Sequence, residues 1–263
     1  MLAKLRLLLP SLILLTLFAC MWGGSTQPEQ APIAGSEAKK TPAQQIVLAE
    51  LFTSQGCSSC PPADAVLQRL AADHQNGELP VIALSYHVDY WNRLGWRDPY
   101  SDAAFSERQR QYAQHINDQG VYTPQLVING QSGHIGSRER AVRNALATAS
   151  QRATGIAIQK QIDWQSDAGQ AIITYELSEA RAGTTLQIAV VEKKVENEVS
   201  RGENRGKHLS HTNVVRQLIS QSNASLSGKV SVELLPELHA KQDNLAIYLF
   251  VQDTKTMAIL GAG

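Results

Sequence analysis

The chain has 263 residues, and 24 Lys and Arg residues balance 24 Asp and Glu residues, so its formal net charge is zero. A neutral chain without runs of like charge lacks the basic surface that nucleic acid requires, so we expect no nucleic-acid partner. The length is sufficient for two ordinary domains once a targeting segment is removed.

The first residues have the pattern of a bacterial export signal. Lys4 and Arg6 precede a mostly apolar stretch, residues 7–18, which is shorter than a membrane-spanning helix requires. The sequence LFAC that follows resembles the lipobox of bacterial lipoproteins. This resemblance implies a signal peptide at residues 1–19 and a lipid anchor on Cys20, which would hold the protein to a membrane in the periplasm. Alternatively, Cys20 is one more apolar residue of a discarded signal.

The next part of the chain predicts a tether followed by a βαβ unit. Residues 20–44 are rich in Gly, Pro, Ser and Gln and have no apolar periodicity, which is typical of a flexible tether. A buried strand is expected at residues 46–52, and Pro61 begins a helix with apolar residues at helical spacing. A second buried strand at residues 81–86 would run parallel to the first.

The remaining pattern divides the chain near its middle. A helix is expected after Ser101 or Asp102, and a short strand at 126–128 precedes a last helix. Beyond that helix the apolar period changes from helical to strand-like, and several short strands with polar joints favour an immunoglobulin-like β-sandwich. The predicted domains are therefore an α/β domain at residues 45–150 and a β-sandwich at residues 151–263.

The chemistry is concentrated in the dithiol motif Cys57-Ser58-Ser59-Cys60. A CxxC motif beside a βαβ unit is typical of a redox site. We expect Cys57 at the N-terminus of the following helix, where the helix dipole stabilises a thiolate. We therefore expect Cys57 to attack and Cys60 to resolve the mixed disulfide by exchange. Three cysteines are an odd number for an exported protein, and a lipidated Cys20 leaves this one pair.

The dithiol lies within a series of sequence motifs: ELFTSQGCSSCPPAD at 50–64, SYHVDYW at 85–91, GWRDP at 95–99, ERQ at 107–109, YTPQ at 122–125, GEN at 202–204 and HTNVVR at 211–216. Together they resemble a family of exported bacterial thioredoxin-like proteins of unassigned function. The resemblance implies a thioredoxin-like fold in which a cis Thr123-Pro124 bond faces the cysteines and docks substrate. The alternative is a trans proline at the start of an edge strand.

The same resemblance suggests a proton acceptor on the first strand. Thioredoxins carry a buried acidic residue beneath the second cysteine, and Glu50 lies near the corresponding place in this chain. Glu50 is therefore expected to take up the proton of Cys60 during exchange. The alternative is that Glu50 points to solvent from a half-buried strand.

A candidate substrate-binding wall follows the second strand. His87, Asp89 and Trp91 come after the carboxyl end of that strand, which is the edge where ligands gather in open α/β sheets. Together with Trp96, Arg97 and Asp98 they are expected to form a substrate-recognition wall beside the dithiol, and Gln125 is expected to contact substrate as well. Alternatively, these residues lock a long loop by capping and stacking.

The segment 201–216 combines basic residues with two histidines. His208 and His211 have a spacing that occurs in metal sites, but no Cys or carboxylate cluster accompanies them, so we expect them to be structural or on the surface. The basic residues around them are expected to form a solvated loop instead of a binding patch.

Three functions are compatible with the dithiol. The first is a thiol-disulfide oxidoreductase that acts on exported proteins or small thiols, with its redox-active disulfide and no other cofactor. The second is a copper- or zinc-binding module, similar to exported proteins that handle copper, in which Cys57, Cys60 and His87 hold the metal. The third is an envelope binding protein with a static disulfide, whose β-rich half contacts a partner.

Overall fold

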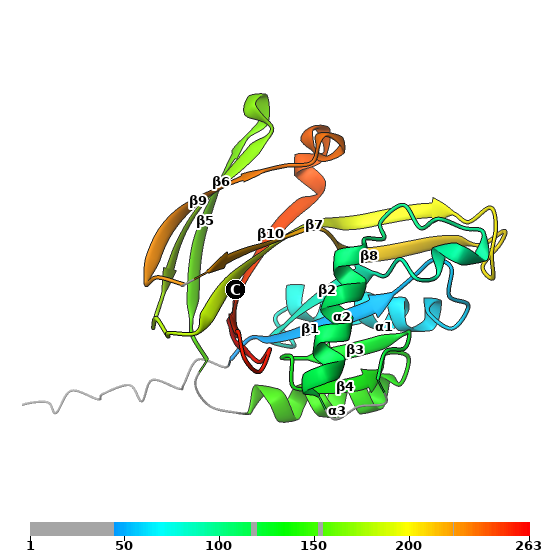
Figure 1. The fold of residues 1–263 in the computed structure, drawn as a ribbon, viewed down its shortest axis with the longest axis horizontal. Helices are drawn as coiled ribbons and strands as arrows, with labels where there is room; N and C mark the ends of the chain where they lie inside the picture. Colours follow the sequence, from blue (N-terminus) through cyan, green and yellow to red (C-terminus); the bar gives the residue numbers. More distant parts are fainter. Residues whose placement is uncertain (1–44, 117–119, 152–154, 223) are drawn as a thin grey trace, which may run out of the picture. The chain divides into compact units, whose positions relative to one another are not determined.

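A computed structural model describes residues 45–263 except 117–119, 152–154 and 223 (Figure 1). The predicted signal peptide, the tether and Cys20 lie outside the described residues. Within the described ranges, no helix is both long enough and apolar enough to cross a membrane.

The first part of the chain contributes four strands and begins as the sequence predicts. β1 (Val47–Thr53) and β2 (Val81–His87) run parallel and are connected by α1 (Pro61–Gln75), which begins with two prolines. Every residue of both strands is buried, as expected for strands covered on both faces. β3 (Gln125–Ile128) pairs antiparallel with β1, and β4 (Ser132–Ile135) pairs antiparallel with β3.

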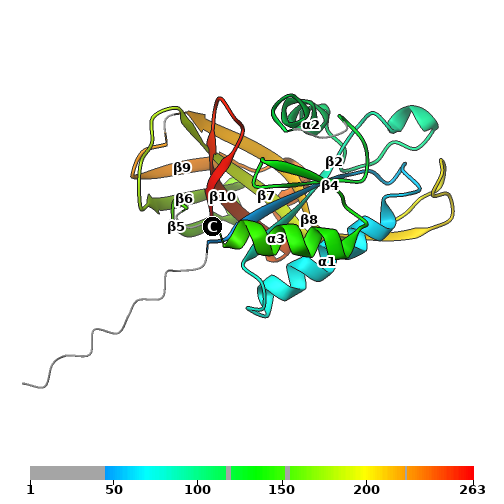
Figure 2. The same cartoon turned by 90° about the horizontal axis from the view of Figure 1, so that it is seen from below.

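Helices cover both faces of these strands. After the short 3-10 helix η1 (Asn92–Leu94), α2 (Ala103–His115) begins at Asp102, whose carboxylate accepts a hydrogen bond from Ala104 N at 2.8 Å. α3 (Glu139–Ser150) follows β4. Figure 2 shows α2 on one face of the sheet and α1 and α3 on the opposite face.

The second part of the chain contributes the remaining strands, β5 to β11. Three of them form a small antiparallel sheet of their own, in the order β5 (Ile158–Gln165), β6 (Gln170–Leu177) and β9 (Ser227–Glu233). The other four belong to a larger sheet: β7 (Thr184–Glu198), β8 (His208–Ser222), β10 (Leu245–Asp253) and the short edge strand β11 (Ile259–Ala262). Short 3-10 helices lie at η2 (Ser166–Ala168) and η3 (Pro236–Asn244).

One eight-stranded sheet contains strands from both parts of the chain. Its order is β11-β10-β7-β8-β2-β1-β3-β4, and the parallel pairing of Ser85 in β2 with Val214 in β8 joins the two parts. The expected thioredoxin-like α/β domain followed by an immunoglobulin-like β-sandwich is therefore wrong, because the large mixed sheet does not stop between them. The sequence does not indicate this arrangement, because β8 lacks the regular apolar alternation that is typical of a strand.

The hydrophobic core also crosses from one part of the chain to the other. On the α2 face, Phe52 and Tyr86 belong to the same buried cluster as Ala189, Val215 and Phe250 from the later strands. A second cluster lies under α1 and α3, and a third fills the space between the small sheet and strands β7 and β10. Because burial of apolar side chains is the main stabilising term of a fold, the two parts stabilise each other.

Candidate functional site

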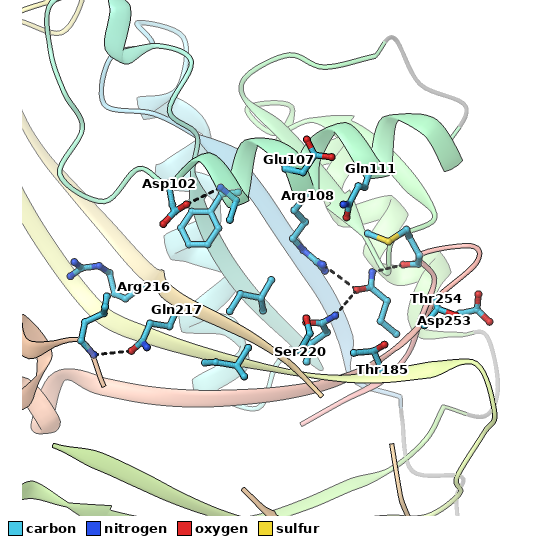
Figure 3. A pocket seen from close by; sticks show the side chains of 18 residues that line it. Asp102, Glu107, Arg108, Gln111, Thr185, Arg216, Gln217, Ser220, Asp253 and Thr254 are labelled. Atoms are coloured by element: carbon cyan, nitrogen blue, oxygen red, sulfur yellow. Dashed lines mark hydrogen bonds between the residues drawn. The ribbon is translucent and has the colours of Figure 1, made fainter. Parts of the chain in front are cut away.

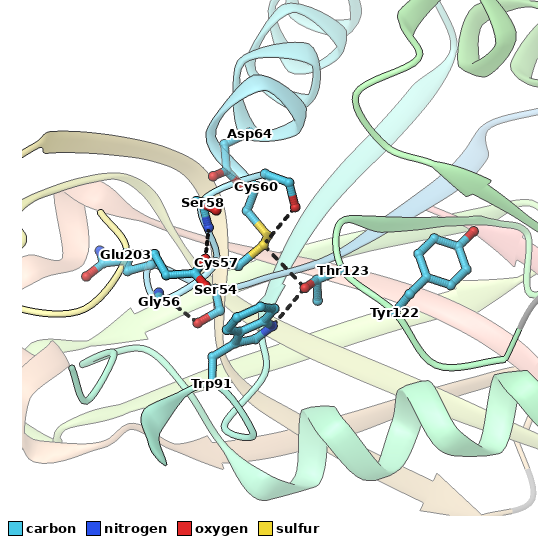
Figure 4. The surroundings of a disulfide bond; sticks show 12 residues. Ser54, Gly56, Cys57, Ser58, Cys60, Asp64, Trp91, Tyr122, Thr123 and Glu203 are labelled. Carbon is cyan, nitrogen blue, oxygen red and sulfur yellow. Dashed lines mark hydrogen bonds between the residues drawn. A yellow bond between two sulfur atoms is a disulfide. The ribbon is translucent and has the colours of Figure 1, made fainter. Parts of the chain in front are cut away.

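Cys57 and Cys60 form a disulfide in the turn that connects β1 to α1 (Figure 4). Two backbone hydrogen bonds shape this turn, from Cys57 N to Ser54 O at 3.1 Å and from Cys60 N to Cys57 O at 3.2 Å. Because α1 begins at Pro61, Cys60 is the residue at its N-cap and Cys57 lies one turn earlier. The expectation that Cys57 stands at the helix N-terminus is therefore corrected.

Two side chains from separate loops converge on the sulfur of Cys57. Trp91 Nε1 donates a hydrogen bond to Thr123 Oγ1 at 2.8 Å, and Thr123 Oγ1 donates to Cys57 Sγ at 3.3 Å. Since an indole N–H can only donate, it fixes the Thr123 oxygen as its acceptor and leaves the hydroxyl hydrogen for the sulfur. The Thr123-Pro124 peptide bond is cis, as predicted.

The disulfide is shielded from solvent. Cys57 and Cys60 are each 0% exposed, whereas Ser58 and Ser59 between them are exposed. Ser59 Oγ lies 3.3 Å from Cys57 Sγ, and the hydroxyl is the donor because a disulfide sulfur carries no hydrogen. A substrate can therefore reach Cys57 only if one of the covering side chains moves.

The loop between β7 and β8, residues 199–207, contacts the dithiol turn from the second part of the chain. Asn204 Nδ2 donates to the carbonyl oxygens of Gln55 and Cys57, both at 2.9 Å, and Asn204 is fully buried. Glu203 Oε2 accepts from Ser58 N at 2.9 Å. The loop approaches so closely that a Cβ at Gly202 would lie 3.3 Å from Trp96 Cβ, and Gly202 has a φ of 74° that favours glycine.

A buried polar network continues from this turn into the molecule. Gln55 N donates to Asp98 Oδ2 at 2.7 Å, and the same oxygen lies 2.7 Å from His87 Nδ1. The ring of His87 packs against the ring of His211 from β8, with centroids 4.6 Å apart. His211 Nδ1 in turn lies 3.5 Å from Asp64 Oδ2 on α1. Both histidines are thus enclosed beside a carboxylate.

The charges in this network shift two pKa values. Burial raises the pKa of Asp98, but attraction to His87 and hydrogen bonds from His87, Gln55 N and Tyr100 N outweigh it, so the net pKa is below its usual value. Burial lowers the pKa of His211, but attraction to Asp64 and a hydrogen bond to it outweigh this effect, and the net pKa is raised. The network therefore favours the charged form of Asp98 and the charged form of His211.

Glu50, the candidate proton acceptor for Cys60, lies in another environment. It is fully buried, and its carboxylate pairs with Arg108, whose Nε donates to Glu50 Oε1 at 2.8 Å. Tyr112 also donates a hydrogen bond to this carboxylate. These partners are on α2, whereas the cysteines precede α1 on the opposite face of the sheet. The structure thus supports neither the expected contact with Cys60 nor the exposed alternative.

The four candidate substrate-binding residues are separated by the fold. Trp91 is beside the dithiol, as described above. His87 is buried in the polar network, and Gln125 is fully buried, where it accepts a hydrogen bond from Gln109 Nε2 at 2.8 Å. Asp89 accepts from the hydroxyl of Ser106 near the start of α2. The structure therefore brings only Trp91 of this set to the sulfur atoms.

The proposed metal ligands do not form a cluster. His87 Nδ1 is bound to Asp98, and within the described ranges no three His, Cys, Asp or Glu side chains are arranged to hold a metal ion. The copper or zinc alternative therefore gains no support from the geometry of Cys57, Cys60 and His87.

A separate cleft of about 670 Å³ lies between α2 and strands β7, β8 and β10 (Figure 3). Arg108 and Gln252 line it, but Arg108 is already bound to Glu50 Oε1 at 2.8 Å and to Gln252 Oε1 at 3.1 Å. The cleft is on the α2 face of the sheet and does not contain the cysteines.

Sequence reasoning missed the residues that the second part of the chain contributes to the site. Asn204 and Glu203 belong to the GEN motif at 202–204, to which the sequence assigns no role. His211 is buried and contacts Gln55, which agrees with its expected structural role, but the sequence does not predict its place beside the dithiol turn. The signal that could have indicated them is the co-occurrence of this motif with the dithiol motif in one chain.

Comparisons with known proteins give a similar solved structure and a matching family. A crystal structure of a protein from Agrobacterium tumefaciens is similar over 83% of this chain and 93% of its own, with a TM-score of 0.62 and 28% identity. A domain of the outer membrane lipoprotein Omp28 from Porphyromonas gingivalis has a TM-score of 0.28 and 14% identity over 42% of this chain and 85% of its own. No match was found among curated proteins. The family described as "Protein of unknown function (DUF1223)" matches residues 48–252, so the chain belongs to this family.

Proposed function

We propose that the protein is a thiol-disulfide oxidoreductase that works by exchange at Cys57 and Cys60. The observation that carries this proposal is the Thr123 hydroxyl, which donates to Cys57 Sγ at 3.3 Å. A donor in this position stabilises negative charge on the sulfur when the disulfide opens, because hydrogen bonds to charged acceptors are stronger than those to neutral ones. Cys57 is therefore the proposed attacking sulfur.

The reaction consists of two exchange steps. The Cys57 thiolate of the reduced protein attacks one sulfur of a substrate disulfide, and the other substrate sulfur leaves as a thiolate that takes up a proton. Cys60 then loses its proton and attacks Cys57 Sγ, which releases the second substrate thiol. Two electrons pass to the substrate, and the protein is left with the Cys57–Cys60 disulfide. Protein disulfides and small disulfides are both suitable substrates for this chemistry.

One observation favours a second candidate, a static structural disulfide in an envelope binding protein. Both cysteines are 0% exposed, and Asn204 holds the carbonyl oxygens of Gln55 and Cys57 in place. A disulfide that no thiol can reach acts as a cross-link only. The two candidates differ in reduction potential, since structural disulfides usually lie below about −300 mV.

The proposed location follows from the export signal and the lipobox-like LFAC sequence that ends at Cys20. We place the dithiol in the bacterial periplasm on a lipid-anchored tether, where exported proteins acquire disulfides. Partners in this location would be exported proteins or small thiols beside the membrane.

The direct test is Cys57→Ser, measured by the turnover of insulin reduction with a dithiol as electron source. The variant is expected to lose all turnover above the uncatalysed rate, because exchange begins at this sulfur. Cys20→Ser is the matched control, since it removes the third of the three cysteines and leaves the dithiol intact. If the Cys57→Ser variant and the parent protein turn over equally, the proposed function is wrong.

A further inference from the structure

The β7–β8 loop (residues 199–207) is held rigidly against the dithiol turn. Lys207 Nζ donates to Asn204 Oδ1 at 2.8 Å, and because an ammonium group can only donate, this contact orients the amide nitrogen of Asn204 toward Gln55 O and Cys57 O. Backbone hydrogen bonds also close the loop on itself, from Gly206 N to Val199 O at 2.7 Å among others. The loop therefore presents its side chains to the cysteines at fixed positions.

Glu203 accepts a hydrogen bond from the backbone amide next to the attacking cysteine. Its Oε2 accepts from Ser58 N at 2.9 Å. Hydrogen bonding from the Ser58 side chain, and then from the Ser58 backbone amide, lowers the pKa of Glu203. The neighbouring amides of the turn are already used, since Cys57 N donates to Ser54 O and Cys60 N donates to Cys57 O. Glu203 thus takes an N–H that could otherwise face a thiolate and puts a negative charge beside it.

We propose that the β7–β8 loop makes the Cys57–Cys60 dithiol a reductant, by placing the Glu203 carboxylate at the amide beside the Cys57 thiolate. This inference rests on the proposed exchange function. Repulsion between carboxylate and thiolate acts on the reduced protein only, because the disulfide is neutral. The burial of Cys57 acts in the same direction, since a low dielectric disfavours the charged sulfur.

The consequence is a direction for electron flow. The dithiol gives two electrons to a substrate disulfide, so that the substrate becomes two thiols and the protein becomes the Cys57–Cys60 disulfide. A dithiol donor of lower reduction potential must then return the electrons to the protein. The second part of the chain, through Glu203, thereby sets the potential of a dithiol that the first part carries.

The test is to equilibrate wild-type protein and Glu203→Gln with reduced and oxidised glutathione and to measure the reduced fraction by alkylation. At pH 8.5 the equilibrium constant for reduction of the variant is expected to rise about threefold to tenfold, the upper value corresponding to about 30 mV. At pH 6 the rise is expected to be smaller, because a protonated thiol does not sense the charge. Because Glu203 is exposed, 0.5 M salt is expected to reduce the rise.

Two further variants separate charge from structure. Glu203→Lys is expected to shift the constant further in the same direction, because it replaces repulsion with attraction. Glu196→Gln is the matched control: Glu196 is an exposed residue on β7 that pairs with Lys194, and its substitution is expected to leave the constant unchanged. The other charged or titratable groups of the loop and of the buried network are the same in all these proteins: Asp64, His87, Asp98, Arg201, Arg205, Lys207 and His211.

Equal constants for the wild-type protein and Glu203→Gln at pH 8.5, or a shift toward the disulfide, would overturn this inference. A shift that is the same at pH 6 and pH 8.5 would also overturn it, because a charge effect requires the thiolate. These failures are distinct from failure of the proposed function, which would appear as undiminished turnover in Cys57→Ser. If the wild-type protein catalyses exchange but Glu203→Gln has the wild-type equilibrium constant, only the role of the loop is contradicted.

Discussion

Trp91 and Thr123 are linked by a hydrogen bond of 2.8 Å that directs the Thr123 hydroxyl at Cys57 Sγ. Thr123→Val keeps the shape of this side chain and removes the donor, so the Cys57 thiolate should be less stable. We expect the rate of attack on a disulfide substrate to fall about tenfold at pH 7, which corresponds to the loss of one hydrogen bond to a charged sulfur. Single-turnover kinetics with the reduced protein measures this rate.

Trp91→Phe should act in the same direction and less strongly. The phenyl ring preserves the packing but no longer fixes the Thr123 hydroxyl, which can then turn away from the sulfur. Trp164→Phe on β5 is the matched control and should leave the rate unchanged. If Trp91→Phe and Thr123→Val both react at the wild-type rate, the Thr123 hydroxyl does not assist Cys57.

Glu50→Gln should destabilise the fold without impairing exchange. Arg108 is only 6% exposed, and removal of the Glu50 charge leaves it without its ion-pair partner in the core. Breaking a buried pair in this way costs about 3–5 kcal/mol, which urea denaturation measures. Glu139→Gln, which breaks surface pairs with Arg69 and Arg143, should cost less than about 1 kcal/mol. A large loss of exchange rate in folded Glu50→Gln would instead support a role at Cys60.

The buried His211 should make stability depend on pH. Its pKa is raised in the folded protein, because attraction to Asp64 outweighs the opposing effect of burial. A group whose pKa is raised by folding stabilises the folded state fully at pH values below its unfolded pKa, which is about 6.5 for histidine. This stabilisation is lost as the pH rises through the folded pKa. The difference in unfolding free energy between wild-type protein and His211→Gln should therefore shrink from pH 5.5 to pH 8.5.

The control for this measurement is His208→Gln on the same strand. His208 is exposed and lies 3.4 Å from Glu196, so its substitution should change stability little at either pH. If the advantage of wild-type protein over His211→Gln grows with pH, the assigned partnership with Asp64 is contradicted.

The sequence predicts the local structure around the cysteines well. The strand before Cys57, the helix after Pro61 and the cis Thr123-Pro124 bond all follow from short-range patterns and motifs. These features depend on neighbouring residues, which the sequence displays directly.

The long-range arrangement could not be read in the same way. β8 is rich in polar residues, Asn213 has a φ of 48°, and the pairing with β7 shifts in register between Val190 and Val191, so regular apolar alternation is interrupted. The segment therefore appeared to be a solvated loop. Without β8 in the sheet, nothing in the sequence indicated that Asn204 and Glu203 reach Cys57, or that Arg108 on α2 takes Glu50.

The reduction potential of the Cys57–Cys60 pair tests the central claim most directly, because it separates an exchanging dithiol from a static cross-link. The exchange function together with the effect of Glu203 predicts a potential between about −300 and −200 mV, in the range of reducing dithiol proteins. The measurement is a redox titration of the folded wild-type protein, followed by thiol alkylation. A value well below about −300 mV would contradict the account and identify the disulfide as structural.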